Sequence, residues 1–294
     1  MRFLLILLVL FCASRALIRA LPGDPLDTLV AETGTSVPRE ALASELGLDR
    51  PFLESLSHDF ARAVRGDFGR SIISREPVAP ILQERFKNTL VLTLAALSLA
   101  LLVSVALGLL AAPSPGSRAD RFCTFYGSLN AALPMPWKGP ILIYLLAVVI
   151  PLFEIGYSLS LPALALSLGF SGLWSRLIRE RVRETLGAGA APGARARGVP
   201  EWKVLLKYGL APCAGSLLAY LGTQLGALLS GAFVAEVIFD WPGMGSLLVE
   251  AVLRRDYPVV ESCVFLGAAV ALLGTLLGDW AQNLADPRLE KLSS

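Results

Sequence analysis

The sequence is short of charged residues for its length. Asp, Glu, Lys and Arg make up 17% of the 294 residues, whereas typical soluble domains carry about 25%. Hydrophobic residues make up 54% and gather in long blocks, which a soluble fold rarely uses. This composition argues against a soluble globular protein and indicates membrane helices.

The sequence also lacks the residues that most metal and catalytic sites need. His58 is the one histidine, so His-based metal centres and Ser-His-Asp catalysis are disfavoured. The cysteines lie far apart, in or beside apolar segments, and predict neither a zinc motif nor a disulfide framework. They are Cys12, Cys123, Cys213 and Cys263. We therefore expect no metal site and no catalytic residues.

The sequence also lacks the features of nucleotide-binding and nucleic-acid-binding proteins. The chain has no G-x-x-x-x-G-K-[ST] loop, so it is not expected to bind and split ATP in that way. No H-E-x-x-H, C-x-x-C or G-x-S-x-G motif is present. With 26 Lys and Arg against 24 Asp and Glu, no basic excess favours nucleic acid. If the chain transports a solute, we expect a separate subunit to supply the energy and no cofactor on this chain.

The apolar blocks predict an all-α membrane protein. A bilayer core needs about 20 apolar residues per helix, and inside lipid a helix satisfies its own backbone hydrogen bonds. The run 90–112 has no charged residue and ends at the turn residues 113–116. We predict six transmembrane helices, at 1–21, 90–112, 122–153 (interrupted by prolines), 159–177, 210–239 and 259–277.

Lysines and arginines in the short loops predict the orientation. The loop after the second span carries Arg118 and Arg121, and residues 178–207 are rich in basic residues. This places both termini and loop 178–207 in the cytoplasm. The chain then divides into the first transmembrane helix (1–21), a small external helical segment (22–87) and a five-helix core (88–290).

The first apolar run has two interpretations. Arg2, a short apolar core and small residues at 14–16 also fit a cleaved signal peptide. A retained helix can direct Arg15 and Arg19 toward the interface, and we adopt that interpretation for the span count.

Loop 178–207 predicts a cytoplasmic helix. Residues 179–186 continue the fourth span with charges, 187–193 are small and include Pro192, and 199–206 are amphipathic. A short helix at 199–206 can dock on a partner, although an ordinary positive-inside loop explains the charges equally well.

A series of motifs resembles one family. The most specific is 236–245 (EVIFDWPGMG), within the stretch 224–245. Together the motifs resemble the inner-membrane permeases of the dipeptide, oligopeptide and nickel class of ABC importers. The others, in order, are 22–25 (PGDP), 46–51 (LGLDRP), 66–71 (GDFGRS), 85–90 (RFKNTL), 255–260 (RDYPVV) and 286–288 (DPR).

The resemblance implies a multi-pass subunit of the bacterial inner membrane. Its expected partners are a homologous second permease, two ATPase subunits and a periplasmic or extracellular substrate-binding protein. It also implies a cytoplasmic coupling helix that sits in a cleft of the ATPase. The positions that carry over, or that lie beside the motif, are Glu184, Ala194, Ala196, Arg197, Gly198, Glu201, Val204 and Leu205.

The chain departs from the family pattern in three places. Residues 187–193 (GAGAAPG) replace a helix-forming stretch, and Gly and Pro in a helix interior cost about 1 and 3 kcal/mol, so a looser coupling element is expected. Lys138 lies in the break of the third span, which is normally apolar. The loop after the third span is short.

Polar residues within the spans are candidates for a substrate path. These are Asn88, Thr89, Asn130, Lys138 and Gln224. Hydrogen bonding between helices is an equally good account of the uncharged ones, and subunit contact or snorkelling are alternatives for Lys138. A rigid external turn is predicted at Trp241, Pro242, Gly243 and Gly245.

The predicted function is a transmembrane permease subunit of an ATP-driven importer, forming half of a path for small peptides or related solutes. The alternative is a degenerate or non-transporting membrane scaffold. An integral-membrane enzyme is disfavoured because the catalytic sets are absent. The substrate (dipeptide, oligopeptide, nickel or other) stays open.

Overall fold

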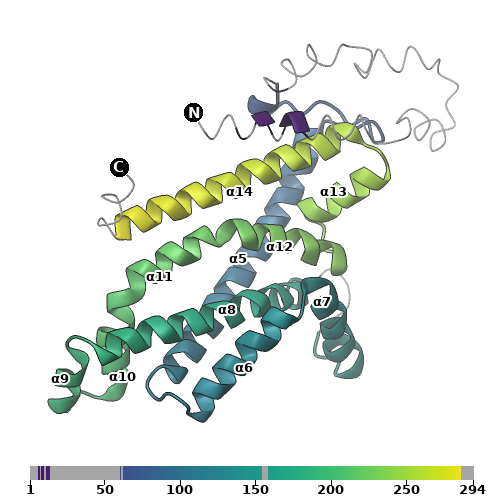
Figure 1. Ribbon diagram of the computed structural model, residues 1–294. Coiled ribbons are helices and arrows are strands. Elements are labelled where there is room, and N and C mark those ends of the chain that lie inside the picture. Colours follow the sequence, from purple (N-terminus) through teal and green to yellow (C-terminus); the bar gives the residue numbers. More distant parts are fainter. Residues whose placement is uncertain are drawn as a thin grey trace, which may run out of the picture. The chain divides into compact units, whose positions relative to one another are not determined.

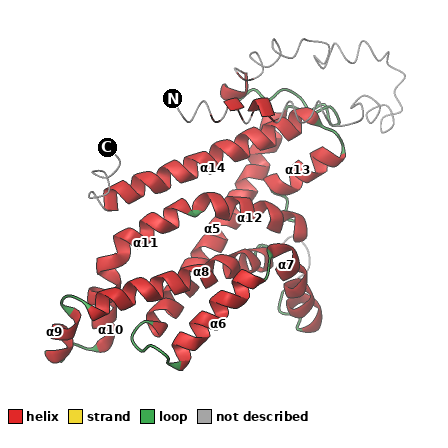
Figure 2. Ribbon diagram, viewed as in Figure 1, coloured by secondary structure: helices red, strands yellow, loops and turns green. Residues whose placement is uncertain are grey.

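The computed structural model describes residues 6, 8, 9, 11–13, 60, 62–153 and 158–285. Within these residues every regular element is a helix, as Figure 2 shows, and Arg70 and Pro77 form one isolated bridge. The predicted all-helical class is confirmed for this part of the chain.

The helices follow one another along the chain with short connections (Figure 1). Two π-helices, η1 and η2, continue α7 and α10 directly. The elements are α5 (Val78–Ala111), α6 (Arg118–Ala132), α7 (Met135–Ile143), η1 (Tyr144–Val149), α8 (Ser160–Gly187), α9 (Ala191–Ala196), α10 (Glu201–Lys203), η2 (Val204–Leu210), α11 (Ala211–Thr223), α12 (Leu225–Ile238), α13 (Met244–Leu253) and α14 (Tyr257–Ala285).

Four described helical segments are long and apolar enough to cross a membrane. They are α5, α8, the continuous stretch Glu201–Thr223 and the part Tyr257–Leu276 of α14. The bent pair Arg118–Ala132 and Met135–Val149 makes a fifth if it counts as one span. The chain is therefore a multi-pass helical protein, and the count of six stays a prediction.

The predicted interruption of the span 122–153 is confirmed, whereas the predicted span 210–239 is wrong as one continuous helix. The span 122–153 is two helices bent by 106°, because Pro134 and Pro136 lack the N–H groups that would continue α6. The span 210–239 breaks at Gln224 into α11 and α12. Glycines at 222 and 226 flank that break and weaken a helix interior.

The limits of the external segment stay predictions, although two helices are longer than the predicted spans. α5 begins at Val78, so the expected limit of the external segment at 87 falls inside a continuous helix. α8 runs to Gly187, as predicted for the charged continuation of the fourth span. Most of the first span, residues 22–59, His58 and the motif at 286–288 lie outside the described residues.

The chain forms two compact units, Met1–Thr89 with Pro242–Leu272, and Leu90–Trp241 with Leu273–Ser294. In the first unit the buried Asp256 carboxylate accepts hydrogen bonds from the Ser71 hydroxyl and, at 3.0 Å, from the Ile72 N–H. This contact joins the motifs at 66–71 and 255–260, which are far apart in sequence. The two motifs therefore have a common structural role.

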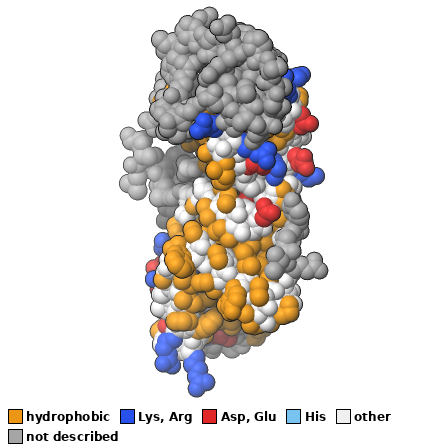
Figure 3. All heavy atoms as spheres, turned by 90° about the vertical axis from the view of Figure 1, so that its right-hand side faces the viewer, with side chains coloured by type: hydrophobic (Ala, Val, Ile, Leu, Met, Phe, Trp, Pro, Cys, Tyr) orange, Lys and Arg blue, Asp and Glu red, His pale blue; other side chains and the backbone are white. Residues whose placement is uncertain are grey.

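The second unit is organised around α8. Helices α6, α7, α11 and α12 all pack against it, and α6 runs beside it in Figure 1. Its buried face includes Trp174 and Ile178. On the outside, hydrophobic side chains cover a wide area of the face in Figure 3, with lysines and arginines at its lower end. Such an exposed apolar surface is what a lipid-facing protein requires.

Close approach of α6 and α8 depends on two glycines. A Cβ at Gly127 would lie 2.8 Å from the carbonyl oxygen of Gly172, and a Cβ at Gly172 would lie 2.9 Å from the Cβ of Asn130. Small residues of this kind let membrane helices pack at short distance.

We predict that Gly127→Ala lowers the thermal midpoint of the purified chain in detergent. The added methyl group meets backbone, which cannot move aside as a side chain would, and such overpacking costs about 1–3 kcal/mol. Gly187→Ala is the control, because a Cβ at Gly187 meets nothing within 4 Å. Equal midpoints for the two variants would contradict the close packing of α6 on α8.

Candidate functional site

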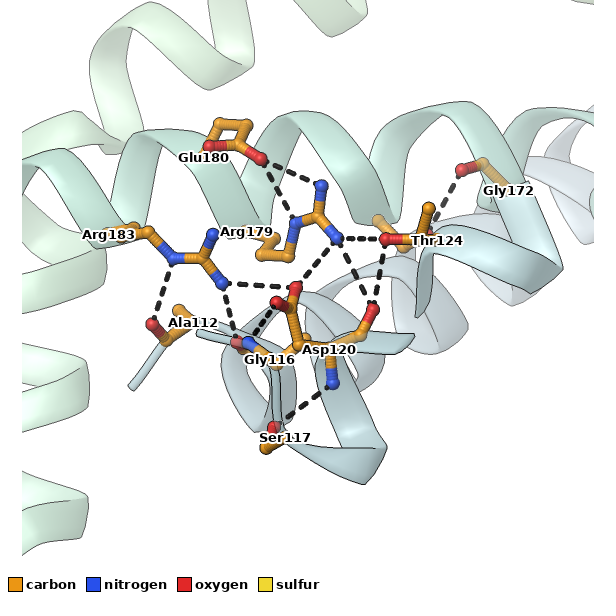
Figure 4. A network of polar contacts seen from close by, with 11 residues as sticks. Ala112, Gly116, Ser117, Asp120, Thr124, Gly172, Arg179, Glu180 and Arg183 are labelled. Atoms are coloured by element: carbon orange, nitrogen blue, oxygen red, sulfur yellow. Dashed lines mark hydrogen bonds and ion pairs between the residues drawn. The ribbon is translucent and has the colours of Figure 1, made fainter. Parts of the chain in front are cut away.

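A polar network centred on the buried Arg179 fixes the charged end of α8 (Figure 4). Arg179 Nη1 donates to Asp120 Oδ1 at 2.8 Å and to Thr124 Oγ1 at 2.6 Å, and its Nη2 lies 2.7 Å from Glu180 Oε1. Arg183 Nη2 lies 3.1 Å from the same Asp120 oxygen. One carboxylate at the start of α6 therefore binds two arginines of α8.

The end of α5 joins this network. Arg183 Nη2 also donates to the carbonyl oxygen of Ala111 at 3.1 Å, and the Gly116 N–H donates to Asp120 Oδ2 at 2.8 Å. The carbonyl groups at a helix end lack intrahelical donors, so a cation there is favourable. This network cannot be predicted from local patterns, because Arg179 and Asp120 are 59 residues apart and basic residues in a loop indicate only topology.

The connector, which we define as residues 188–210, begins with the Gly- and Pro-rich stretch. Gly187 ends α8, Gly189 lies in a turn with φ of +71°, and Pro192 occupies the first turn of α9. A proline there is tolerated because its missing N–H has no intrahelical role. The free-energy costs expected in a helix interior therefore do not apply at Gly187, Gly189 and Pro192. Gly193 is the one glycine of this stretch that lies within α9.

The turn between α9 and α10 is held by the backbone and by one ion pair. Gly198 has φ of +77°, its N–H donates to the Arg195 carbonyl at 2.9 Å, and the Val199 N–H donates to the Ala194 carbonyl at 3.1 Å. Across this turn Arg195 donates to both carboxylate oxygens of Glu201, at 2.7 and 3.1 Å. The connector is therefore a folded helix-turn-helix.

One side of the connector is built into the core of the second unit. Ala191, Ala194 and Val204 are fully buried and pack with Ile178, Val182 and Leu186 of α8. Gly209 also lies against α8, since a Cβ there would be 3.0 Å from Val182 Cγ1. Its carbonyl oxygen accepts a hydrogen bond from Thr185 Oγ1 at 2.6 Å. Movement of the connector is therefore tied to movement of α8.

The predicted coupling residues divide into two groups. Ala194 and Val204 are buried, Leu205 is half-buried against the same cluster, and Glu201 pairs within the chain. Glu184 is exposed and lies 3.2 Å from Arg181. Ala196, Arg197 and Gly198 are exposed at the end of α9. Among the predicted coupling residues, the exposed ones are those that a partner can reach.

Two of the predicted path residues meet at the break between α6 and α7. Lys138 is buried, and its Nζ donates to the carbonyl oxygen of Asn130 at 3.3 Å. That carbonyl belongs to the last turn of α6, where cations are stabilising. The Asn130 amide in turn donates to the Tyr126 carbonyl at 3.0 Å. Lys138 therefore closes the C-terminal end of α6.

Two other path candidates meet the predicted external turn. The Asn88 amide donates to the Pro242 carbonyl at 2.9 Å, and the Met244 N–H donates to Thr89 Oγ1 at 2.8 Å. The turn is also capped by Ser246, whose Oγ accepts from the Gly243 N–H at 3.0 Å. Residues that were predicted for separate roles thus form one hydrogen-bonded group within the first unit.

The remaining predicted residues lie at helix ends. The Trp241 N–H donates to the Glu236 carbonyl at 2.9 Å, after the C-terminus of α12. Gly245 is buried in the first turn of α13. Gln224 occupies the junction of α11 and α12, where its N–H donates to the Leu221 carbonyl at 3.1 Å.

Comparison with known proteins identifies the family. The model of the family described as "Binding-protein-dependent transport system inner membrane component" matches residues 104–291. The chain is 32% identical to the oligopeptide transport system permease protein AppB of Bacillus subtilis, over 97% of this chain and 95% of that protein. It is also 32% identical to the glutathione transport system permease protein GsiC of Escherichia coli K12, over 92% of this chain and 90% of that protein.

A third relative is the dipeptide transport system permease protein DppB of Escherichia coli K12. It is 31% identical over 93% of this chain and 92% of its own length. These relatives are permease subunits, they match nearly end to end, and the predicted resemblance is confirmed. The chain therefore belongs to the family of binding-protein-dependent inner membrane transport components and is a permease subunit of the peptide class of ABC importers.

Proposed function

We propose that this chain forms half of the translocation path of an ATP-driven importer for small peptides. The support for peptides is the shared naming of the relatives, whose transport systems are described as oligopeptide, glutathione and dipeptide systems. A homologous second permease supplies the other half of the path. Two ATPase subunits and a substrate-binding protein complete the assembly.

The proposal rests on the way in which the connector is packed on α8 and braced across its turn. Its buried side is packed on α8 through Ala191, Ala194 and Val204, and Arg195 and Glu201 lock its turn. The exposed Arg197 and Gly198 then project from a supported surface. A docking element needs both an exposed side and a tightly packed side, because a partner's movement reaches the membrane helices only through rigid contacts.

The connector and both termini lie in the cytoplasm in this proposal, with six spans in total. The ATPase cleft receives the end of α9, and Arg197 faces acidic groups of that subunit. Because the turn is supported by the chain itself, the Gly- and Pro-rich stretch at 187–193 is compatible with coupling. ATP is then used by the partner, and this chain needs no cofactor.

The substrate path is proposed for the helix breaks. Asn130 and Lys138 lie at the bent pair of α6 and α7, and Gln224 lies at the break of α11 and α12. Broken helices commonly line transport paths. Asn88 and Thr89 support the 242–244 turn, so their contribution to the path is indirect.

Changing Gly198 tests the docking role. We predict that Gly198→Val lowers peptide-stimulated ATP hydrolysis and peptide uptake of the reconstituted importer about fivefold or more. A β-branched residue is strained at φ of +77°, while a Cβ there meets nothing within 4 Å. The change therefore acts on the turn and on the surface offered to the partner, and leaves the core intact.

The control is Gly66→Val, which introduces the same kind of strain in the first unit. Gly66 has φ of +81° and open space around it. We expect this variant to retain coupling when it is present at the wild-type level in the membrane. Wild-type hydrolysis and uptake in Gly198→Val, or equal losses in both variants, would contradict docking through the α9–α10 turn.

Lys138→Leu separates a capping role from a path role. The change leaves the Asn130 carbonyl without its cation, and hydrogen bonds to charged groups contribute about 1.5–3 kcal/mol. We predict a thermal midpoint several degrees below wild type, with Lys138→Arg restoring most of it. The proposed path role predicts in addition a raised KM for peptide uptake by folded Lys138→Leu transporter. An unchanged KM would leave Lys138 as a helix cap and remove it from the path.

A further inference from the structure

One face of the connector is both aromatic and cationic. Trp202 is 61% exposed and Leu206 is 46% exposed, and a spacing of four residues places them side by side on a helix. Lys203 and Lys207, which are also exposed and four residues apart, lie next to them. We call Trp202, Lys203, Leu206 and Lys207 the Trp202 face.

The two lysines differ from most basic residues nearby. Arg179, Arg183 and Arg195 bind carboxylates, whereas no carboxylate of the described residues pairs with Lys203 or Lys207. Glu201, the nearest acid in sequence, is already bound by Arg195. Both ammonium groups are therefore available to an anion from outside the chain.

Each lysine instead lies over an aromatic ring. Lys203 Nζ is 5.3 Å from the ring centroid of Trp202, and Lys207 Nζ is 5.7 Å from that of Tyr208. The ring quadrupole attracts the cation without neutralising its charge. Each cation is therefore held by a ring while its charge stays uncompensated.

The position of the face indicates its surroundings. It occupies the first turns of the apolar stretch Glu201–Thr223, and Leu218, farther along the same stretch, is 64% exposed. Trp and Lys at the end of a membrane span are typical of the headgroup level. A lysine there lays its stem on apolar surface and directs its ammonium to the phosphates.

We propose that the Trp202 face binds the headgroup of an anionic phospholipid. Lys203 and Lys207 bind the phosphate, and Trp202 and Leu206 lie against the glycerol and the upper acyl chain. Lipid is favoured over a protein occupant because the face lies at the start of a stretch long and apolar enough to span a membrane, on which Leu206 and Leu218 are both exposed. The inference goes beyond transport, since a bound lipid would anchor the start of this span at the bilayer surface.

Native mass spectrometry of the purified full-length chain with added phosphatidylglycerol or phosphatidylcholine tests the proposal. We expect wild type to prefer phosphatidylglycerol, and Lys203→Gln/Lys207→Gln to lose that preference by roughly 10- to 30-fold, given the attraction of about 1 kcal/mol per basic residue. Arg197→Gln is the charge control for lipid binding only, because this exposed arginine lies on the α9 side of the turn, and the purified variant should keep the lipid preference of wild type.

Tryptophan quenching gives an independent readout. The emission that Trp202→Phe removes should be quenched more strongly by brominated phosphatidylglycerol than by brominated phosphatidylcholine. An unchanged lipid preference in the double lysine variant, or an equal loss in Arg197→Gln, would overturn the proposal. It would also be overturned if the double variant kept its lipid preference and instead failed to copurify with the ATPase, because the face would then belong to the protein interface.

Discussion

The second unit depends on the binding of two arginines by one carboxylate. Asp120 accepts from Arg179 at 2.8 Å and lies 3.1 Å from Arg183. Three helix ends meet there, since the Ala111 carbonyl also binds Arg183 and the Gly116 N–H also binds Asp120. Removing Asp120 would leave the buried Arg179 without its partner on α6, which is destabilising. The network therefore fixes α8, and α8 carries the connector.

Proline and glycine determine where the helices bend and where the connector approaches α8. Pro212 has no N–H for the Tyr208 carbonyl, and the wider π-helix η2 precedes it. Gly209, within η2, lies so close to Val182 that a Cβ added at this glycine would be only 3.0 Å from Val182 Cγ1. Residues that disfavour a regular helix thus produce the close contact between the connector and α8. For the proposed function, this contact is the route by which a partner's movement reaches a membrane span.

The sequence predicted the parts of the fold that depend on local apolar content. The uncharged run at 90–112 marked α5, and the clean run at 159–177 marked α8 together with its charged continuation. The prolines at 134 and 136 were visible, but a 106° bend depends on how α7 packs against α8 and α12. Apolar content carries no information about direction, so the bent pair was counted as one span.

The parts of the candidate site that lie within a local motif could be predicted from the sequence. The parts that depend on contacts between residues far apart in the chain could not. Ala196 and Gly198 were predicted from the motif, but the burial of Val204 and the pairing of Glu201 with Arg195 required the tertiary structure. The Ser71–Asp256 contact explains why two distant motifs occur together. Lys138, predicted from its unusual charge, lies against a helix-end carbonyl, a partner that only the bend brings within reach.

The central claim is that the exposed end of α9 contacts the ATPase. Ala196 is exposed at this end, so Ala196→Cys can carry a short photoactivatable crosslinker in the assembled importer. Leu253→Cys, at a residue of the first unit that is 79% exposed, is the comparison. The account predicts an ATPase adduct from position 196 and none from position 253. An adduct from position 253 alone, or none from position 196 in an active complex, would contradict it.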